Sequence, residues 1–270
     1  MVHGAVAARR PSADRIVFLG HATILIELAG VRLLTDPLLR LGVGPLRRQV
    51  PLCDASLSAA PDAVLISHLH RDHLDLASLR LLGRETPLLV PAGAGEWLGR
   101  QGFGDVRELA AGESAAVGPL TVSATPARHD GHRHPGGMRA QTLGFLVQGR
   151  GTVYFAGDTE LFPGMAEISG GLAGGLDVAL LPVAGWAPKL GPGHMGPLEA
   201  ARAAAMLAPR LAIPIHWGTL LPVGFARRYG ARLGEPPRLF AEHAARLAPE
   251  VEVQVLQPGQ EASLSGLPRR

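Results

Sequence analysis

The 270-residue sequence predicts a mixed α and β fold built on one large core. Short apolar runs, typical of buried strands, alternate with segments whose apolar residues have helical spacing. These elements come in two similar groups, roughly residues 15–110 and 114–256, and no linker of domain-boundary composition separates them. Apolar residues make up 47% of the chain, which is enough for a sizeable core. We therefore expect one domain over residues 15–270 and a disordered tail over residues 1–14.

The first group of elements starts with three strands, and the last two are joined at Ala29-Gly30, a hairpin signal. Residues 40–60 are rich in Gly, Pro and Arg, which predicts a long surface loop of the kind that often borders a site. A strand over residues 63–67 and a helix over residues 74–82 follow this loop. The other predicted strands cover residues 15–19, 23–28, 31–35, 87–91 and 106–110, and a short helix covers residues 94–101.

The second group of elements contains the clearest helix, over residues 197–207. Pro197 lies in its first turn, and Glu199 lies near the positive end of its dipole. Further helices are predicted over residues 160–168 and 237–247. A glycine-rich break at residues 170–175 follows the first of them. The predicted strands cover residues 114–117, 120–124, 143–148, 152–156, 178–181, 211–215 and 251–256.

A dense group of metal-ligand side chains follows the strand over residues 63–67. His68, His70, Asp72 and His73 stand within six positions on the predicted turn between this strand and the next helix. Side chains two positions apart at a strand end face the same way, so His68 and His70 can bind one metal ion. Asp72 and His73 turn into the helix start and can face a second ion. A solvated charged loop is the alternative, but the position directly after a buried strand favours a metal site.

The pattern His-x-His-x-Asp-His after a strand resembles the metallo-β-lactamase superfamily. The segments Phe-Leu-Gly-His-Ala-Thr at residues 18–23 and Leu-Thr-Asp-Pro at residues 34–37 are similar to one branch of it. That branch contains ascorbate-6-phosphate lactonase and the N-acyl-phosphatidylethanolamine phospholipase D enzymes. Matching motifs run from residue 16 to residue 218. The resemblance implies a four-layer αββα metallo-β-lactamase sandwich, but it leaves the substrate open because this fold hosts several kinds of hydrolase.

The resemblance also implies the third ligand of the first ion. His129 follows the strand over residues 120–124, at the place where the family has this ligand. His132 is the alternative, while His132 and His134 otherwise belong to an exposed glycine-rich loop. Arg128 or Arg133 could orient an anionic group nearby.

The remaining implied ligands lie at the ends of two later strands. Asp158, in a Gly-Asp-Thr sequence, resembles the family's bridging aspartate, which would hold two ions roughly 3.5–4 Å apart. The alternative is a helix N-cap, a role that Thr159 could also fill. His216 would be the last ligand of the second ion. The full implied set is His68, His70 and His129 on one ion, Asp72, His73 and His216 on the other, and Asp158 between them.

Three more residues have roles implied by the resemblance. Asp36 would support the metal-binding histidines by hydrogen bonding, and the alternative is a turn-forming Asp-Pro. His21 lies on a hairpin turn that in this fold reaches toward the site, so it is either a substrate contact or a turn residue. His194 precedes the helix over residues 197–207, where the family has a histidine that touches substrate or donates a proton. A helix dipole and two cations should lower the pKa of its imidazole.

These observations lead to a hypothesis of a dinuclear zinc hydrolase. A hydroxide bridging two Zn²⁺ ions would attack a phosphodiester-like or lactone substrate, with the phosphodiester slightly favoured. Residue 70 is histidine where the oxygen-reducing di-iron relatives have glutamate, so nitrogen-rich ligation favours zinc over Mn²⁺ or Fe²⁺. The candidate catalytic residues are Asp72, His21 and His194, of which His194 would protonate the leaving group. A nuclease on the same fold and a non-catalytic metal-binding regulatory protein are the alternatives.

The composition limits the partners. The net charge is +3 and the pI is about 9.7, but the arginines are scattered and no aromatic residues alternate with them. A nucleic-acid partner is therefore not favoured, whereas a small anionic substrate is compatible. No apolar run reaches transmembrane length, and Cys53, the only cysteine, allows no intrachain disulfide. We expect a cytoplasmic protein, and the sequence leaves its oligomeric state open.

Overall fold

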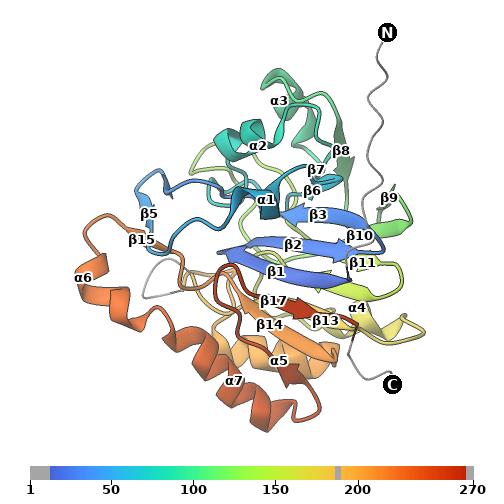
Figure 1. The fold of residues 1–270 in the computed structure, drawn as a ribbon, viewed down its shortest axis with the longest axis vertical. Helices are drawn as coiled ribbons and strands as arrows, with labels where there is room; N and C mark the ends of the chain where they lie inside the picture. Colours follow the sequence, from blue (N-terminus) through green and yellow to red (C-terminus); the bar gives the residue numbers. More distant parts are fainter. Residues whose placement is uncertain (1–12, 186–189, 266–270) are drawn as a thin grey trace.

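The computed structural model describes residues 13–185 and 190–265, which form a four-layer sandwich (Figure 1). Two β-sheets face each other, and helices cover their outer faces, so the predicted αββα fold is confirmed. Of the predicted tail, residues 1–12 lie outside the described residues, while the Asp14 carboxylate accepts a hydrogen bond from the Ala29 amide at 2.7 Å. No described helix has the length and apolar character needed to cross a bilayer.

The first sheet is built mostly from the first group of elements. Ile16 and Phe18 of its second strand pack between the two sheets, whereas Val17 and Leu19 pack under the helices on the outer face. Both faces are buried because successive side chains of a strand point to opposite sides. In spatial order the strands are β17 (Glu261–Ser263), β1 (Arg15–Gly20), β2 (Thr23–Leu28), β3 (Val31–Thr35), β6 (Ala63–Leu65), β7 (Leu88–Pro91) and β8 (Val106–Leu109), and the outer helices are α2 (Leu76–Leu82) and α3 (Gly95–Arg100).

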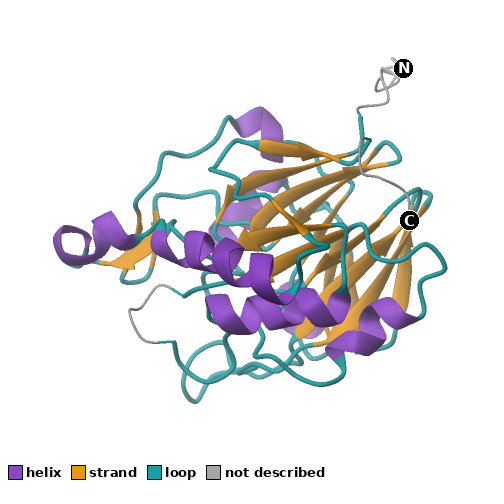
Figure 2. Cartoon of the chain, turned by 90° about the horizontal axis from the view of Figure 1, so that it is seen from below, coloured by secondary structure: helices purple, strands orange, loops and turns teal. Residues whose placement is uncertain are grey.

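The second sheet carries the C-terminal helices on its outer face, as Figure 2 shows. Buried alanines line α5, and their small side chains let this helix contact both α7 and the sheet. In spatial order the strands are β16 (Glu252–Val253), β14 (Leu211–Ile215), β13 (Val178–Pro182), β12 (Thr152–Phe155), β11 (Leu143–Gln148), β10 (Leu120–Pro126) and β9 (Ser114–Val117), and the helices are α4 (Met165–Gly170), α5 (Pro197–Leu207) and α7 (Glu235–Leu247).

The predicted loop over residues 40–60 contains short regular elements. Two of its strands join one from the C-terminal half in a small third sheet. Strands of two or three residues are too short to show alternation, which is why the sequence did not indicate them. These strands are β4 (Gly42–Val43), β5 (Leu46–Arg48) and β15 (Leu220–Pro222), and the further short helices are α1 (Ala55–Ser58), α6 (Ala226–Tyr229) and the 3₁₀-helix η1 (Gly230–Arg232).

The helix predicted over residues 160–168 begins only at Met165. Pro163 explains the difference, because the residue before a proline is pushed out of the α region. The helix therefore cannot run through residue 162, and Gly164 is its N-cap. Neither Asp158 nor Thr159 caps this helix, so the capping alternative for Asp158 is wrong.

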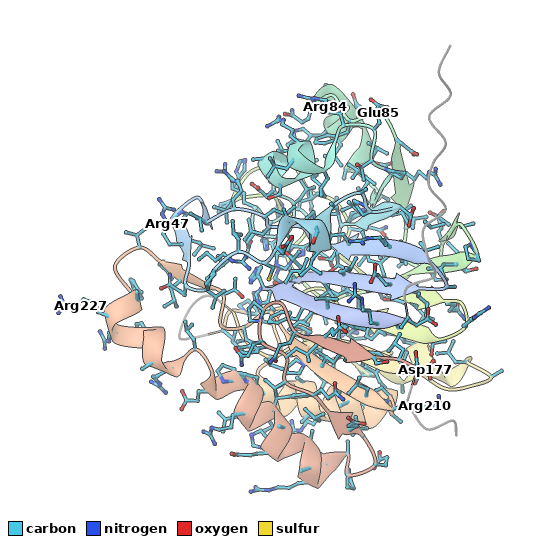
Figure 3. The ribbon with its side chains drawn as sticks, viewed as in Figure 1. Arg47, Arg84, Glu85, Asp177, Arg210 and Arg227 are labelled. Carbon is cyan, nitrogen blue, oxygen red and sulfur yellow. The ribbon has the colours of Figure 1, made fainter. Side chains whose placement is uncertain are left out.

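The parallel strands bring distant residues to one edge of the sandwich. β3, β6 and β7 are parallel in the first sheet, and β12, β13 and β14 are parallel in the second. Segments that follow their carboxyl ends meet at the same edge. At the opposite end, Arg210 before β14 pairs with Asp177 before β13, with Nη1 and Oδ1 2.7 Å apart (Figure 3).

Candidate metal centre

Three imidazoles from two sheets converge on one point. The Nδ1 atom of His70 lies 3.0 Å from Nε2 of His68 and 3.0 Å from Nε2 of His129. His68 and His70 follow β6, and His129 follows β10. His132 instead directs Nδ1 to the carboxylate of Asp130, at 2.7 Å. The structure therefore brings together His129, and not His132, with the two histidines of the motif.

The outer nitrogens of these imidazoles are held by the surrounding chain. Nδ1 of His129 donates to the carbonyl oxygen of Gly193 at 2.8 Å, and Nδ1 of His68 lies 2.9 Å from the Ser67 hydroxyl. Gly193 has a φ of +78°, and a Cβ there would come within 2.9 Å of the His129 ring. A glycine is thus needed for the close approach that fixes His129, with its Nε2 turned inward.

A second cluster lies beside the first. Nε2 of His73 is 3.1 Å from Nε2 of His216 and 3.8 Å from Oδ2 of Asp72. Nδ1 of His216 donates to the carbonyl oxygen of Ala184 at 2.7 Å, which leaves its Nε2 facing the cluster. All three ligand-type side chains are buried. The structure therefore also brings together the predicted ligands of the second ion.

Asp158 contacts the second cluster and lies within 4.8 Å of His129 of the first. Its Oδ2 lies 3.2 Å from Nε2 of His73 and 3.1 Å from Nε2 of His216. Its Oδ1 is buried and has no hydrogen-bond partner among the described residues. Gly157 allows this placement, since it has a φ of +61° and a Cβ there would lie 2.6 Å from Cβ of Ser67. A buried carboxylate oxygen without a donor is costly unless a cation binds it.

Asp36 supports the clusters from behind. It is fully buried, and its Oδ2 accepts hydrogen bonds from Nδ1 of His73 at 2.7 Å and from the Ser67 hydroxyl at 2.5 Å. Its Oδ1 accepts from the Ser67 amide at 2.7 Å. Because both its oxygens are occupied, Asp36 fixes the orientation of His73 and, through Ser67, of His68. This arrangement is the supporting role implied by the resemblance.

His21 belongs to the second cluster and does not reach the surface. Its side chain is 3% exposed, and its Nε2 lies 3.1 Å from Oδ2 of Asp72. Its ring centroid is 4.0 Å from that of His216, and its carbonyl oxygen accepts the His216 amide hydrogen bond. Burial and the neighbouring His216 lower the pKa of His21 to about 3, so its imidazole is neutral. These contacts suit a residue that positions Asp72 more than one that meets a substrate.

His194 lies at the open side of the centre. Its Nδ1 is 3.2 Å from the carbonyl oxygen of Pro192, and its Nε2 is 3.5 Å from Oδ2 of Asp158. The side chain is 21% exposed, whereas Asp158 and His216 beside it are buried. Burial alone would lower the pKa of His194, but the hydrogen bond and charge of Asp158 outweigh it and raise that pKa. The side chains around His194 therefore shift its pKa in the opposite direction to the shift expected from the helix dipole and two bound cations.

The charges of the centre suit a metal ion. Burial and neighbouring histidines lower the pKa of His68 well below its usual value, and burial lowers that of His129 to about 4. Burial also lowers the pKa of His73, but Asp158 and Asp72 outweigh it and raise that pKa well above the usual value. Neutral imidazoles and ionised carboxylates are the forms that bind metals. The ionised carboxylates of Asp72 and Asp158 thus attract a cation to the imidazoles around them.

The distances also fit a metal ion. Two nitrogens bound to one tetrahedral zinc are about 3.3 Å apart, as follows from Zn–N bonds of about 2.0–2.1 Å. The nitrogens of the first cluster are 3.0 Å apart, and those of His73 and His216 are 3.1 Å apart. Small movements would bring either set to the zinc spacing. The residues present therefore fit two ions, with Asp158 shared between them.

Several supporting residues carry no sequence signal of their own. The carbonyl groups of Gly193 and Ala184 are backbone atoms, and only the folded chain brings them to the histidines. Thr219 accepts the His21 amide hydrogen bond at 2.7 Å and holds the hairpin turn in place. Ser67 is the exception, because its position directly before the histidine motif could have indicated a supporting role. Arg128 packs over the Phe162 ring, with its Cζ 5.4 Å from the ring centroid.

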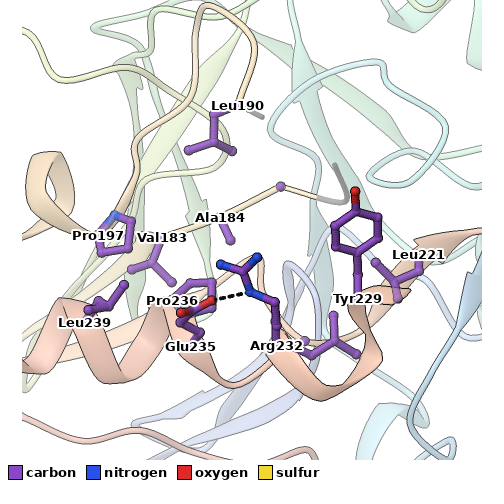
Figure 4. A pocket seen from close by; sticks show the side chains of 13 residues that line it. Val183, Ala184, Leu190, Pro197, Leu221, Tyr229, Arg232, Glu235, Pro236 and Leu239 are labelled. Carbon is purple, nitrogen blue, oxygen red and sulfur yellow. Dashed lines mark hydrogen bonds and ion pairs between the residues drawn. The ribbon is translucent and has the colours of Figure 1, made fainter. Parts of the chain in front are cut away.

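An apolar pocket of about 250 Å³, whose lining Figure 4 shows, is formed partly by segments next to those that carry His194 and His216. Ala184, whose carbonyl oxygen holds His216, lies in its wall, and so does Pro197, three residues after His194. The polar side chains of the lining include Arg232 and Glu235, whose Nε and Oε2 are 2.9 Å apart. The other lining residues are Val183, Gly185, Leu190, Gly218, Leu221, Tyr229, Leu233, Pro236 and Leu239.

The fold and the site together define the class of protein, namely an αββα sandwich with a candidate histidine and aspartate metal centre at one edge of its sheets. The β-lactamase superfamily domain matches residues 31–217. The chain is 34% identical over 256 residues to a UPF0173 metal-dependent hydrolase of Methanopyrus kandleri, covering 91% of this chain and 98% of the relative. It is 31% identical over 234 residues to the N-acyl-phosphatidylethanolamine-hydrolyzing phospholipase D 1 of Caenorhabditis elegans, covering 78% of this chain and 65% of the relative.

A solved structure agrees with these sequence matches. A metallo hydrolase from the hyperthermophilic archaeon Ignicoccus hospitalis superposes with a TM-score of 0.72 at 25% identity, covering 93% of this chain and 98% of that chain. The chain therefore belongs to the β-lactamase superfamily and has the metallo-β-lactamase fold. The resemblance drawn from the sequence motifs is confirmed, including the likeness to the phospholipase D branch.

Proposed function

We propose that the chain is a metal-dependent hydrolase with a dinuclear centre. His68, His70 and His129 would hold one ion, and Asp72, His73 and His216 the other. The observation that carries the proposal is Asp158, whose Oδ2 faces the second cluster while its buried Oδ1 has no partner among the described residues. A carboxylate that shares its two oxygens between two ions is the arrangement a two-metal hydrolase needs.

Zinc is the metal that the donor set favours, with manganese and iron as alternatives. The full ligand set has five imidazoles and two carboxylates, and nitrogen-rich ligation suits zinc. Bound zinc ions would polarise the attacked bond and lower the pKa of a shared water toward about 7. Zinc has no redox chemistry, so this donor set favours hydrolysis over oxidation.

His194 is proposed to donate a proton to the leaving group. Its Nδ1 lies near the carbonyl oxygens of Gly191 and Pro192, at 3.3 and 3.2 Å, so the ring is held from one side. Its Nε2 faces the centre and is partly accessible, 3.5 Å from Oδ2 of Asp158. Its Nε2 can carry a proton toward the leaving group, as a general acid requires.

The proposed substrate is a small phosphodiester or, second, a lactone. The phospholipase D relative named above supports the phosphodiester, and an anionic substrate is attracted to a cationic centre. The apolar pocket lined by Ala184, Pro197 and Gly218, close in the chain to the ends that carry His194 and His216, supports a substrate with an apolar group near the reacting bond. A substrate with an anionic reacting group and an apolar substituent fits both the cationic centre and the apolar pocket.

The proposal is tested by metal analysis combined with activity. Protein purified without chelator should contain about two equivalents of metal per chain. The same preparation should hydrolyse bis(p-nitrophenyl) phosphate, and a lactone and a thioester serve as comparison substrates. Activity should vanish on chelation and return with zinc. A folded protein that hydrolyses these substrates equally well without metal would contradict the proposal.

A further inference from the structure

Four arginines surround a second cavity that the metal centre does not use. The cavity has a volume of about 250 Å³, well above the roughly 30 Å³ that one water molecule takes up. Its charged lining consists of four guanidinium groups and one carboxylate, and the rest is small or apolar. The lining residues are Arg40, Arg71, Arg80, Arg133, Asp75, Val43, Gly44, Leu76 and Ala77.

This cavity lies on the outer side of the metal-binding loop. Arg71 stands between His70 and Asp72 in the sequence, but its side chain is exposed, whereas those of the ligands turn inward. None of the candidate ligands lines the cavity. Arg133 clamps the same loop, because its Nη1 donates to the carbonyl oxygens of Leu69 and Leu74 at 2.9 and 3.1 Å.

Two of the arginines are already occupied. Arg40 binds both oxygens of Asp75, with Nε–Oδ2 at 2.8 Å and Nη2–Oδ1 at 2.7 Å. Asp75 also accepts hydrogen bonds from the amide and hydroxyl of Ser78, so it has little capacity left for another cation. Arg133 lies over the Trp97 ring, with its Cζ 4.7 Å from the centroid. These groups form a fixed frame.

The other two arginines have no partner in the part of the chain that the structure describes. Arg71 and Arg80 are exposed and make no hydrogen bond or ion pair with any described residue. Burial and the neighbouring Arg71 lower the pKa of Arg133, so the charges are close enough to repel each other. Four positive charges against one carboxylate leave an excess of three at this cavity. A bound anion would relieve that repulsion.

We propose that this cavity binds a phosphate-type anion at a site separate from the metal centre. Planar guanidinium groups donate paired hydrogen bonds that match the oxygens of a phosphoryl group. Arg71 and Arg80 supply the free donors, while Arg40 and Arg133 add fixed charge. The anion is inorganic phosphate or the terminal phosphoryl group of a small molecule. Because the bound anion would contact Arg71, it would also stiffen the outer side of the loop that carries the metal ligands.

Isothermal titration calorimetry of the metal-loaded protein with inorganic phosphate tests this site. Arg80→Gln should weaken phosphate binding about tenfold, because it removes charge-assisted hydrogen bonds. Arg150→Gln is the matched control, since Arg150 is an exposed arginine in the turn between β11 and β12 and does not line the cavity. It changes the net charge equally and should leave phosphate affinity unchanged. Equal affinities in the wild type and Arg80→Gln would overturn the proposal.

A further variant separates this site from the metal ions, which also attract phosphate. Asp158→Ala disturbs the metal centre but not the arginine cavity, so phosphate binding should persist in it. Loss of phosphate binding in Asp158→Ala together with retention in Arg80→Gln would place the anion on the metals and contradict the proposal. Titration with glycerol 3-phosphate distinguishes inorganic phosphate from the phosphoryl group of a small molecule as the bound anion. Tighter binding than inorganic phosphate supports a small phosphorylated molecule, and weaker binding supports free phosphate, at the same cavity.

Discussion

Three non-glycine residues of the metal centre have positive φ angles, namely His21 at 58°, Asp36 at 35° and His216 at 60°. Such conformations cost about 1–3 kcal/mol each and persist only where the surroundings hold them. The hydrogen bonds of Asp36 to Ser67 and His73 and of His216 to Ala184 provide that hold. At the scale of single residues, the chain therefore accepts backbone strain in order to aim side chains at the centre.

Asp158→Ala should remove both metal ions or leave one weakly bound. No neutral methyl group can lie between two cations, and the buried His73 and His216 would lose their shared anion. Metal content per folded chain, measured by mass spectrometry of digested protein, checks this. Asp105→Ala is the matched control, because Asp105 pairs with the exposed Arg107 and belongs to none of the candidate ligand clusters. Unchanged metal content in Asp158→Ala would refute a bridging role.

His194→Ala should keep both metals and lower kcat by about 10²–10⁴-fold, the usual effect of losing one general acid. The loss should shrink for p-nitrophenolate esters, because that leaving group departs without a proton. Steady-state kinetics over a series of leaving groups measures it. A raised KM with no dependence on the leaving group would assign His194 to substrate binding instead. His134→Ala, an exposed histidine outside the clusters, should behave like the wild type.

At the scale of elements, the centre depends on how strands end. β6 ends at Leu65 and β12 at Phe155, three residues before His68 and Asp158, and β14 ends at Ile215, directly before His216. Gly157 after β12 and His216 after β14 have positive φ angles and turn the chain inward. Gly157, between β12 and Asp158, shows the requirement best. It combines a positive φ with a close approach to Ser67 of the other sheet.

Gly157→Ala should lower the free energy of unfolding by about 1–3 kcal/mol, the cost of a side chain in the left-handed region. The new Cβ would also push Asp158 away from the metals, so metal content should fall with stability. Urea denaturation gives the first quantity and elemental analysis the second. Gly174→Ala, where φ is not positive and no atom lies within 4 Å of the new Cβ, should change stability by less than about 0.5 kcal/mol. Equal effects of both variants would show that Gly157 has no special conformation.

At the scale of the whole molecule, the ligands tie the two sheets together. His68, His70, Asp72 and His73 follow a strand of the first sheet, and Asp158 and His216 follow strands of the second. An ion bound between them is a cross-link that exists only in the folded state. Metal binding is therefore coupled to the stability of the sandwich.

Removal of metal should lower the melting temperature by on the order of 10 °C. An ion present at a thousandfold excess over its dissociation constant contributes about 4 kcal/mol, and each kcal/mol shifts Tm by about 2–4 °C at this size. Calorimetry of the metal-loaded protein with and without EDTA measures the shift. The Asp158→Ala variant, with weakened binding, should show a much smaller shift. A wild-type melting temperature that does not respond to EDTA would contradict the cross-link.

The sequence by itself determined the elements and the chemistry of the ligands. Buried strands alternate with amphipathic helices, so apolar spacing alone predicted most element positions. The metal-binding chemistry could also be recognised locally, because the ligand-type residues between His68 and His73 stand together after one strand. Short strands such as β4, β5 and β15 stayed hidden, since two or three residues carry no periodicity.

Only the tertiary structure decided which distant groups meet. It brought His129 to His68 and His70 while His132 turned to Asp130, and it buried His21 against Asp72. It also showed that Asp158 caps no helix, because Pro163 delays that helix to Met165. Spacing along the chain holds no information on these contacts, since strand pairing and sheet packing set the distances between residues far apart in sequence. The same reason hid the arginine cavity, whose four guanidinium groups come from three separate segments.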